Sequence, residues 1–359
     1  MTQGTSFLTK RINLYTNLLS FSGNRVIIVR TLRKMSTLGF EKVASPTVFP
    51  FPASKFNARN DAEMLKTAFR GIGCDKKTVI GILCNRDNAQ RVQIGKTYLN
   101  LYGEDLKKRL NSETSGNLTK LLVSLVTPLN EYLAEQLHDA MEGMGTDEKV
   151  LIEILTTLDN ASMYEVKRCY QKLYGKTLEE DIKGDTSGHF KRLCISLAVG
   201  NRNENTVVVD KKLAMEDAKK LYDAGEGKWG TDESTFNSIL VSQSHAQLRQ
   251  VFQDYSTITG HAMEEAIKNE FSGDIKNGLL AIVKIVQDKS AYFSERLHKS
   301  MKGLGTDDKS LIRILVYRSE IDLGDIKITF KQMYGDTLEN WIIGDTSGDY
   351  KAALLAIVK

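Results

Sequence analysis

The segment Glu142–Leu155, "EGMGTDEKVLIEIL", has a close counterpart much later in the chain, at Lys302–Leu315, "KGLGTDDKSLIRIL". Each copy joins a Gly-x-Gly-Thr-Asp corner to apolar residues at helical spacing, such as Leu151, Ile154 and Leu155. A corner and a helix that recur in this way indicate an internal repeat.

Two further copies complete a fourfold repeat: "RGIGCDKKTVIGIL" from Arg70 and "GKWGTDESTFNSIL" from Gly227. The glycines that precede Thr or Cys mark four units of similar length: Gly73, Gly145, Gly230 and Gly305. A second glycine follows each of these at a constant distance: Gly103, Gly175, Gly260 and Gly335. Beyond it, again at a constant distance from the corner, an acid opens an "ETSG", "DTSG" or "EFSG" motif: Glu113, Asp185, Glu270 and Asp345.

The pattern predicts an all-α fold with five short helices in each unit. The Gly-x-Gly corner joins the first helix to the second, and the acid lies in the turn between the fourth and fifth. The corner threonines Thr146, Thr231 and Thr306 are placed to act as N-caps. The second glycine of each unit reads as a C′ residue that ends a helix, and the Ser-Gly pairs begin new helices.

The predicted organisation is a tail, four repeats and one long connection. We expect a tail at 1–56, repeats at 57–127, 128–200, 213–287 and 288–359, and a linker at 201–212 that divides the repeats into two pairs. The end of the tail, "PTVFPFPASKF", holds three of the four prolines and disfavours helix.

The corner and the distant acid together suit a hard cation. Glycines at positive φ turn carbonyl oxygens outward, and calcium accepts about 6 to 8 oxygen ligands in irregular geometry. Three carbonyls and one bidentate acid supply about five oxygens, which leaves room for water or a phosphate. A single carboxylate leaves a local charge of about +1, so the site is weak alone and an anionic lipid phosphate completes it. The structural alternative is a helix–helix turn with a charge at a helix N-terminus, which does not require the constant spacing between corner and acid.

Composition excludes several other functions. Residues 1–34 hold six basic residues and no acid, so the remaining chain has a net charge of −2 and is not a polycation built for nucleic acid. The two "GKT" sequences lack the first glycine of a phosphate-binding loop, and the five histidines show no zinc-ligand spacing, which argues against an enzyme. Four cysteines without C-x-x-C spacing fit reduced thiols in a cytosolic protein.

The basic N-terminal stretch has two interpretations. Its acid-free, Ser/Thr-containing composition is that of a transit peptide. It is also consistent with a disordered tail or with an extension upstream of a start at Met35, which we favour.

Four units of similar length, K-G-x-G-T-D corners and a G-D-T-S-G acid at a constant distance from them resemble the annexin family from about Phe56 to Lys359. The resemblance implies a slightly curved disc of four five-helix repeats with calcium loops on its convex face and the tail across its concave face. It implies calcium-dependent binding to acidic phospholipids such as phosphatidylserine, and no catalysis. The expected protein is cytoplasmic, reaches membranes peripherally when calcium rises, is a monomer in solution that can form membrane-bound oligomers, and uses its tail to recruit a protein partner.

Carried over by position, the resemblance implies four calcium sites, each made of three carbonyls and one carboxylate. Their residues are Phe69, Gly71, Gly73 and Glu113; Met141, Gly143, Gly145 and Asp185; Gly225, Lys228, Gly230 and Glu270; and Met301, Gly303, Gly305 and Asp345. The apolar loop tips that would touch the membrane are Ile72, Met144, Trp229 and Leu304. For Trp229, packing back onto the following helix is the alternative.

Two departures from the family pattern stand out. Cys74 replaces the corner threonine of the first repeat, which makes that site the least secure. Of the two ion pairs that family members carry around a central channel, Glu153 and Arg313 can form one, whereas Leu133 and Leu158 replace the other. We expect a drier and less conductive centre. The rival function is a metal-independent α-helical scaffold for protein interactions, which explains the repeats but not the acid spacing.

Overall fold

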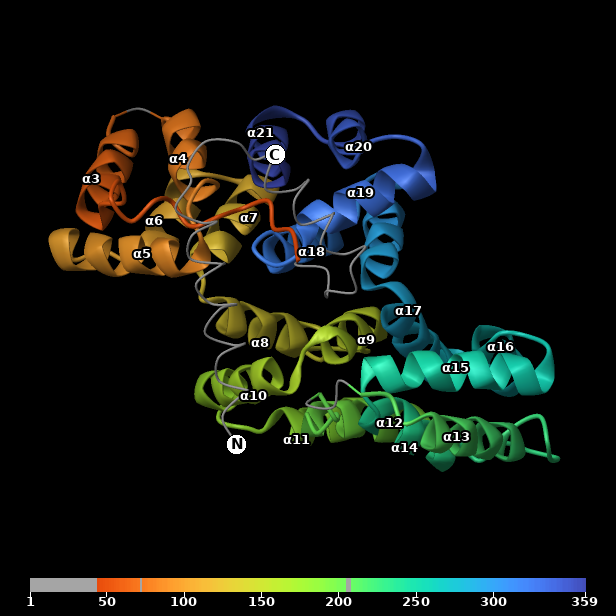
Figure 1. The fold of residues 1–359 in the computed structure, drawn as a ribbon. Helices are drawn as coiled ribbons and strands as arrows, with labels where there is room; N and C mark the ends of the chain where they lie inside the picture. Colours follow the sequence, from red (N-terminus) through yellow and green to blue (C-terminus); the bar gives the residue numbers. More distant parts are fainter. Residues whose placement is uncertain (1–43, 72, 205–207) are drawn as a thin grey trace, which may run out of the picture. The chain divides into compact units, whose positions relative to one another are not determined.

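The computed structural model describes residues 44–71, 73–204 and 208–359, and the chain divides into two units between Ser45 and Pro46. The described part contains nineteen helices, labelled α3 to α21, and no strand, which confirms the all-α prediction. All of these helices belong to the second unit (Figure 1).

Each repeat is built from five helices. The first contains α3 (Ala58–Ala68), α4 (Lys76–Leu83), α5 (Asn88–Tyr102), α6 (Leu106–Glu113) and α7 (Gly116–Val126). The second contains α8 (Leu129–Asp139), α9 (Glu148–Thr157), α10 (Asn160–Tyr174), α11 (Leu178–Asp185) and α12 (Gly188–Val199). The third contains α13 (Lys211–Ala224), α14 (Glu233–Ser242), α15 (His245–Thr259), α16 (Met263–Glu270) and the first half of α17 (Gly273–Met301). The fourth contains the second half of α17, then α18 (Asp308–Arg318), α19 (Leu323–Tyr334), α20 (Leu338–Asp345) and α21 (Gly348–Val358).

The local signals that end and begin these helices are those predicted. The third helix of every repeat stops at a left-handed glycine, for example Gly103 at φ 66° and Gly175 at φ 71°. The fifth helix of every repeat starts directly after a serine, as α12 does after Ser187. These two signals fix the lengths of the helices that carry the distant acids.

Two helices that meet at a kink, together labelled α17, join the third repeat to the fourth. α17 runs through 29 residues, and its backbone leaves the helical region only at Asp288, where φ is −154° and ψ is 100°. The Asp288 carboxylate accepts a hydrogen bond from the Ala291 amide at 2.9 Å, so it caps the second half as an N-cap residue does. The third repeat therefore passes into the fourth without a loop (Figure 1).

The packing of the repeats in space does not follow their order in the sequence. α21 of the fourth repeat packs against α4 and α7 of the first, and α12 of the second packs against α14 of the third. Polar contacts cross both seams: Asn117 donates to Asp308 at 2.5 Å, and Asn237 donates to Ser196 at 2.8 Å. The contacts between repeats in space therefore join the first to the fourth and the second to the third, on either side of the linker.

The described part of the linker packs on the repeats that it connects. The Arg202 guanidinium donates to the carbonyls of Leu240 and Gln243, at 3.1 and 2.7 Å. The Asn160 amide donates to the Glu204 carboxylate at 3.1 Å. The described part of the linker thus ties the second repeat to the third.

The end of the predicted tail also packs on the repeats. Val48 is buried, and the amides of Thr47 and Val48 both donate to the carbonyl of Ser319, at 2.8 and 2.9 Å. Further along, the Phe51 amide donates to the Gln90 side chain at 2.8 Å. Ser319 follows α18 and Gln90 lies in α5, so residues 46–56 connect the fourth repeat to the first. As predicted, the described residues before Ala58 form no helix.

Two further expectations can be compared with the described residues. All four cysteines are free. No helix in these ranges has the length and apolar character needed to cross a bilayer.

Candidate calcium and membrane site

Four loops of similar construction join the first and second helices of the repeats. In each, the amide of the aspartate that begins the second helix donates to a carbonyl at the end of the first helix. These bonds join Asp75 to Ala68 (2.9 Å), Asp147 to Ala140 (2.8 Å), Asp232 to Ala224 (2.7 Å) and Asp307 to Ser300 (2.7 Å). The loops are therefore closed at their base, and the intervening residues project from the helices.

The corner glycines adopt the predicted backbone. In the second repeat Gly143 and Gly145 have φ of 99° and 92°, and in the fourth Gly303 and Gly305 have φ of 119° and 84°. A residue with a Cβ is strained there, so glycine is required. In the described part of the chain, the carbonyls of these four glycines accept no hydrogen bond and remain available to a ligand.

The third loop differs from the others in the backbone of its first glycine, Gly225. Gly230 has φ of 80°, but Gly225 does not adopt positive φ. A Cβ at Gly225 would lie 3.3 Å from Cγ of Glu270 and 3.3 Å from the ring of Phe236. Glycine is needed here because the loop backbone packs directly against the distant acid.

The distant acids are brought to their loops in the second, third and fourth repeats by the corner threonine. Thr146 Oγ1 donates to the carbonyl of Asp185 at 3.0 Å. Thr231 Oγ1 lies 2.6 Å from Glu270 Oε2, and Thr306 Oγ1 lies 2.5 Å from Asp345 Oδ2. The constant spacing in the sequence therefore corresponds to a direct contact between the loop and the last residue of the fourth helix.

The prediction that these threonines are N-caps is wrong. The N-cap is the next residue in each repeat; for example, the Asp307 carboxylate accepts from the Ser310 amide at 3.1 Å. Burial opposes the ionised form of Asp307, but the hydrogen bonds from Ser310 prevail and lower the pKa of this carboxyl. The threonine hydroxyl is instead used to hold the acid.

The first repeat is different. Cys74 stands in the threonine position, and within the described residues its thiol forms no hydrogen bond to Glu113. Burial, and then the nearby Glu113 carboxylate, raise the pKa of the Cys74 thiol. The link between loop and acid is made by Arg109, whose Nη2 lies 2.9 Å from the Phe69 carbonyl and 2.8 Å from Glu113 Oε1.

The apolar loop tips lie fully in solvent. Met144, Trp229 and Leu304 are 106%, 104% and 109% exposed. Trp229 thus does not fold back onto the following helix, which was the alternative for this residue. Ile72, the fourth predicted tip, lies outside the described residues.

The donor set is suited to a hard cation held mainly by backbone oxygens. In the described ranges no cluster of three or more His, Cys, Asp or Glu side chains could hold a metal ion. The second, third and fourth repeats instead offer loop carbonyls and one carboxylate, the combination that calcium tolerates. The Asp185 carboxylate makes no ion pair or hydrogen bond in the described part of the chain.

A buried charge cluster lies between the second and fourth repeats. Glu153 of α9 is fully buried and pairs with Arg313 of α18 at 2.8 Å, as expected, and with Arg296 of α17 at 2.9 Å, which was not expected. Burial opposes the charge on Arg313, but the adjacent Glu153 carboxylate prevails and raises the pKa of Arg313. Leu133 is buried in the apolar core and Leu158 packs against it. The low conductance expected of this centre stays a prediction.

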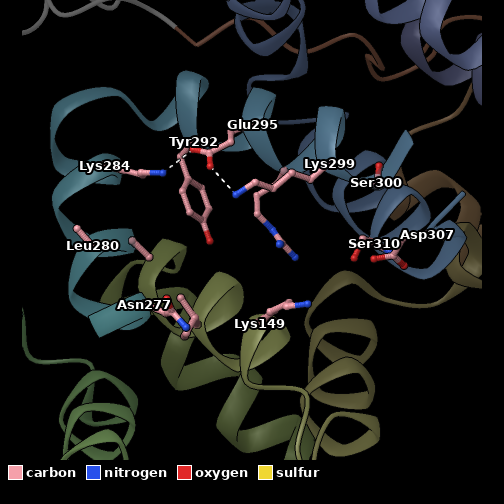
Figure 2. Close-up of a pocket in the computed structure, with 13 residues that line it drawn as sticks. Lys149, Asn277, Leu280, Lys284, Tyr292, Glu295, Lys299, Ser300, Asp307 and Ser310 are labelled. Atoms are coloured by element: carbon pink, nitrogen blue, oxygen red, sulfur yellow. Dashed lines mark hydrogen bonds and ion pairs between the residues drawn. The ribbon is translucent and has the colours of Figure 1, made fainter. Parts of the chain in front are cut away.

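A cavity of about 520 Å³ lies beside this cluster (Figure 2). Its lining comes from α9, both halves of α17 and the start of α18. Glu295 accepts from Lys284 and from Lys299, both at 2.6 Å, across one side of the cavity (Figure 2). Lys149, at the start of α9, also lines the cavity and has no ionic partner in the described residues.

Comparison with known proteins gives a consistent result. The family model described as Annexin matches residues 60–125, 132–197, 216–282 and 292–357. Human annexin A7 is 48% identical over 307 residues, which cover 86% of this chain and 63% of that protein. This chain thus spans less than two thirds of annexin A7, whereas mouse annexin A13 is 47% identical over 84% of this chain and 95% of its own length.

Solved structures are similar in both fold and sequence. The structure of annexin III has a TM-score of 0.86 and 45% identity, covering 88% of this chain and 97% of its own. The structure of calcium-bound annexin (Sm)1 has a TM-score of 0.79 and 34% identity, covering 88% of this chain and 93% of its own.

Proposed function

Since the chain belongs to the annexin family, we propose that it binds membranes containing acidic phospholipids when calcium is present, by binding alone and without catalysis. Calcium-dependent phospholipid binding is the property for which this family is known. The calcium-bound structure of annexin (Sm)1 supports the choice of metal.

The observation that carries the proposal is the contact between each distant acid and its loop in three repeats. The proposed ligands are the carbonyls of Met141, Gly143 and Gly145 with Asp185; those of Gly225, Lys228 and Gly230 with Glu270; and those of Met301, Gly303 and Gly305 with Asp345. A helix–helix turn alone would not require the threonine hydroxyl to reach an acid 39 residues away.

Charge explains why the membrane is part of the site. One carboxylate offsets only half of the charge on Ca²⁺, so each ion keeps about one positive charge and free coordination positions. A lipid phosphate supplies both an oxygen ligand and a negative charge. Calcium and lipid therefore strengthen the binding of each other, and several sites on one chain multiply the effect.

The exposed tips Met144, Trp229 and Leu304 add an apolar contribution. They lie between or beside the corner glycines, so an ion bridged to a phosphate would bring these side chains to the headgroup region. Indole favours this region of a bilayer. The same proposal places the protein in the cytoplasm, as a monomer that reaches membranes reversibly, with a tail that recruits a protein partner.

Sedimentation with phosphatidylserine vesicles tests this function. We expect the protein to sediment with vesicles in calcium and to stay in the supernatant in EGTA. Asp185→Ala combined with Asp345→Ala should raise the calcium concentration for half-maximal sedimentation. Asp223→Ala combined with Asp336→Ala removes two exposed acids outside the proposed sites and should leave it unchanged.

A metal-independent scaffold would behave differently. It would stay in the supernatant with and without calcium, and the two double variants would be indistinguishable. That result would reject the proposed function.

A further inference from the structure

Arg109 contacts two of the four groups that would hold calcium in the first repeat. Its Nη2 donates to the Phe69 carbonyl at 2.9 Å and lies 2.8 Å from Glu113 Oε1. Its Nη1 lies 3.8 Å from Glu104. One protein cation therefore already joins the loop to the distant acid.

The charges of this arrangement are balanced before any metal arrives, because Glu104 also lies 3.5 Å from Lys66. An arginine guanidinium stays protonated at all ordinary pH values. Its positive charge is offset by Glu113, whose side chain is only 18% exposed. A calcium ion at the same place would meet a positive charge, a neutralised carboxylate and a carbonyl that is already in use.

Among the described residues, no cation pairs with the distant acid of any of the other three repeats. Four residues before their acids stand Asp181, Ala266 and Trp341. Their acids accept a threonine hydroxyl or, at Asp185, leave the carboxylate without a partner in the described part of the chain. The first repeat thus differs from the other three in two ways. Its distant acid pairs with a cation, and its loop is linked to that acid by an arginine and not by a threonine hydroxyl.

We infer that Arg109 is a built-in cation that takes the place of calcium in the first repeat, so that this repeat binds no calcium at concentrations that fill the other three. The inference rests on the proposed function of the second, third and fourth repeats. It replaces the calcium site predicted for the first repeat, formed by Phe69, Gly71, Gly73 and Glu113, with a permanent internal ion pair. The bridge between loop and acid in the first repeat then persists at every calcium concentration.

The test counts the calcium ions bound per chain on phosphatidylserine vesicles by equilibrium dialysis with radioactive calcium. Glu113→Gln should bind as many ions as the wild type, whereas its matched counterpart Asp185→Asn should bind one fewer. Arg109→Ala should bind one more ion. Adding Glu113→Gln to Arg109→Ala should remove the additional ion.

Two outcomes would overturn the inference: loss of one ion in Glu113→Gln alone, or no gain in Arg109→Ala. Circular dichroism establishes that each variant is folded. If Arg109→Ala is not folded, Arg109→Met replaces it, because this side chain keeps an aliphatic stem of similar length but has neither the charge nor a donor for the Phe69 carbonyl. Failure of the wild type and every variant to bind calcium would reject the proposed function, and the inference with it.

Discussion

The hydroxyl of Thr306 lies 2.5 Å from the carboxylate of Asp345, although the two residues are 39 positions apart in the sequence. Both residues lie at helix boundaries: Thr306 precedes the N-cap of α18, and Asp345 is the last residue of α20. The contact thus holds α20, the fourth helix of this repeat, against the loop that precedes α18, the second helix.

Thr306→Val should raise the calcium concentration needed for half-maximal vesicle sedimentation. The carboxylate loses a hydrogen bond worth about 0.5–1.5 kcal/mol, which corresponds to a change of roughly 2- to 10-fold. Thr257→Val is the matched control, because the Thr257 hydroxyl contacts only a carbonyl of its own exposed helix turn. An equal change in both variants would contradict the role given to Thr306.

Removing the acid of the central cluster should be costly. Glu153→Ala leaves Arg313, which is 2% exposed, and Arg296 without their shared partner. Loss of one partner of a buried pair costs about 3–5 kcal/mol of unfolding free energy, measurable by urea denaturation. Glu153→Leu combined with Arg313→Leu removes both members of the closest pair and should be less destabilising. A double variant as unstable as Glu153→Ala would contradict this account.

Trp229→Ala should weaken vesicle binding at saturating calcium without changing stability, because the side chain is fully exposed. Losing an inserted indole costs about 1–2 kcal/mol, or roughly 5- to 30-fold in affinity. Trp341→Phe provides a second measurement, since it leaves Trp229 as the sole tryptophan. In this variant the fluorescence emission of Trp229 should shift to shorter wavelength when calcium and vesicles are both added. Unchanged emission would show that Trp229 does not enter the bilayer.

The stability of the repeats should decrease in mild acid because of His245. Burial, together with Arg202, Lys289 and Arg249, lowers the pKa of His245 from 6.5 to about 3. The folded state then binds fewer protons than the unfolded state between these values, so the unfolding free energy falls as pH falls below about 6.5. At pH 5 the loss is about 2 kcal/mol. His245→Gln should lack this contribution, and identical pH slopes of denaturation for variant and wild type would contradict the prediction.

Much of the fold was predictable because its signals are local. The glycines after Tyr102 and Tyr174 end helices by their own backbone preference, and the Ser-Gly pairs begin them. The N-cap was wrongly placed on Thr146, Thr231 and Thr306 because both members of a Thr-Asp pair favour that position. The aspartate is the N-cap because the threonine hydroxyl contacts the distant acid, far along the chain, which no local pattern indicates.

The missed residues differ in how far a sequence signal could have revealed them. Arg109 and Glu113 are four residues apart in one helix, a spacing that already indicates an ion pair. Arg296 reaches Glu153 across 143 residues, and no local pattern indicates this contact. The pairing of the first repeat with the fourth was missed for the same reason.

That pairing has a consequence for biosynthesis. In an ordinary repeat array each unit packs only on its neighbours in sequence, so units can become stable one after another as the chain emerges. Here α4 and α7 leave the ribosome well before their partner α21. At about 5–20 residues per second, translating from α7 to α21 takes tens of seconds. During that interval the surface of α4 and α7 that α21 later covers stays exposed in the nascent chain, where it can associate with other chains.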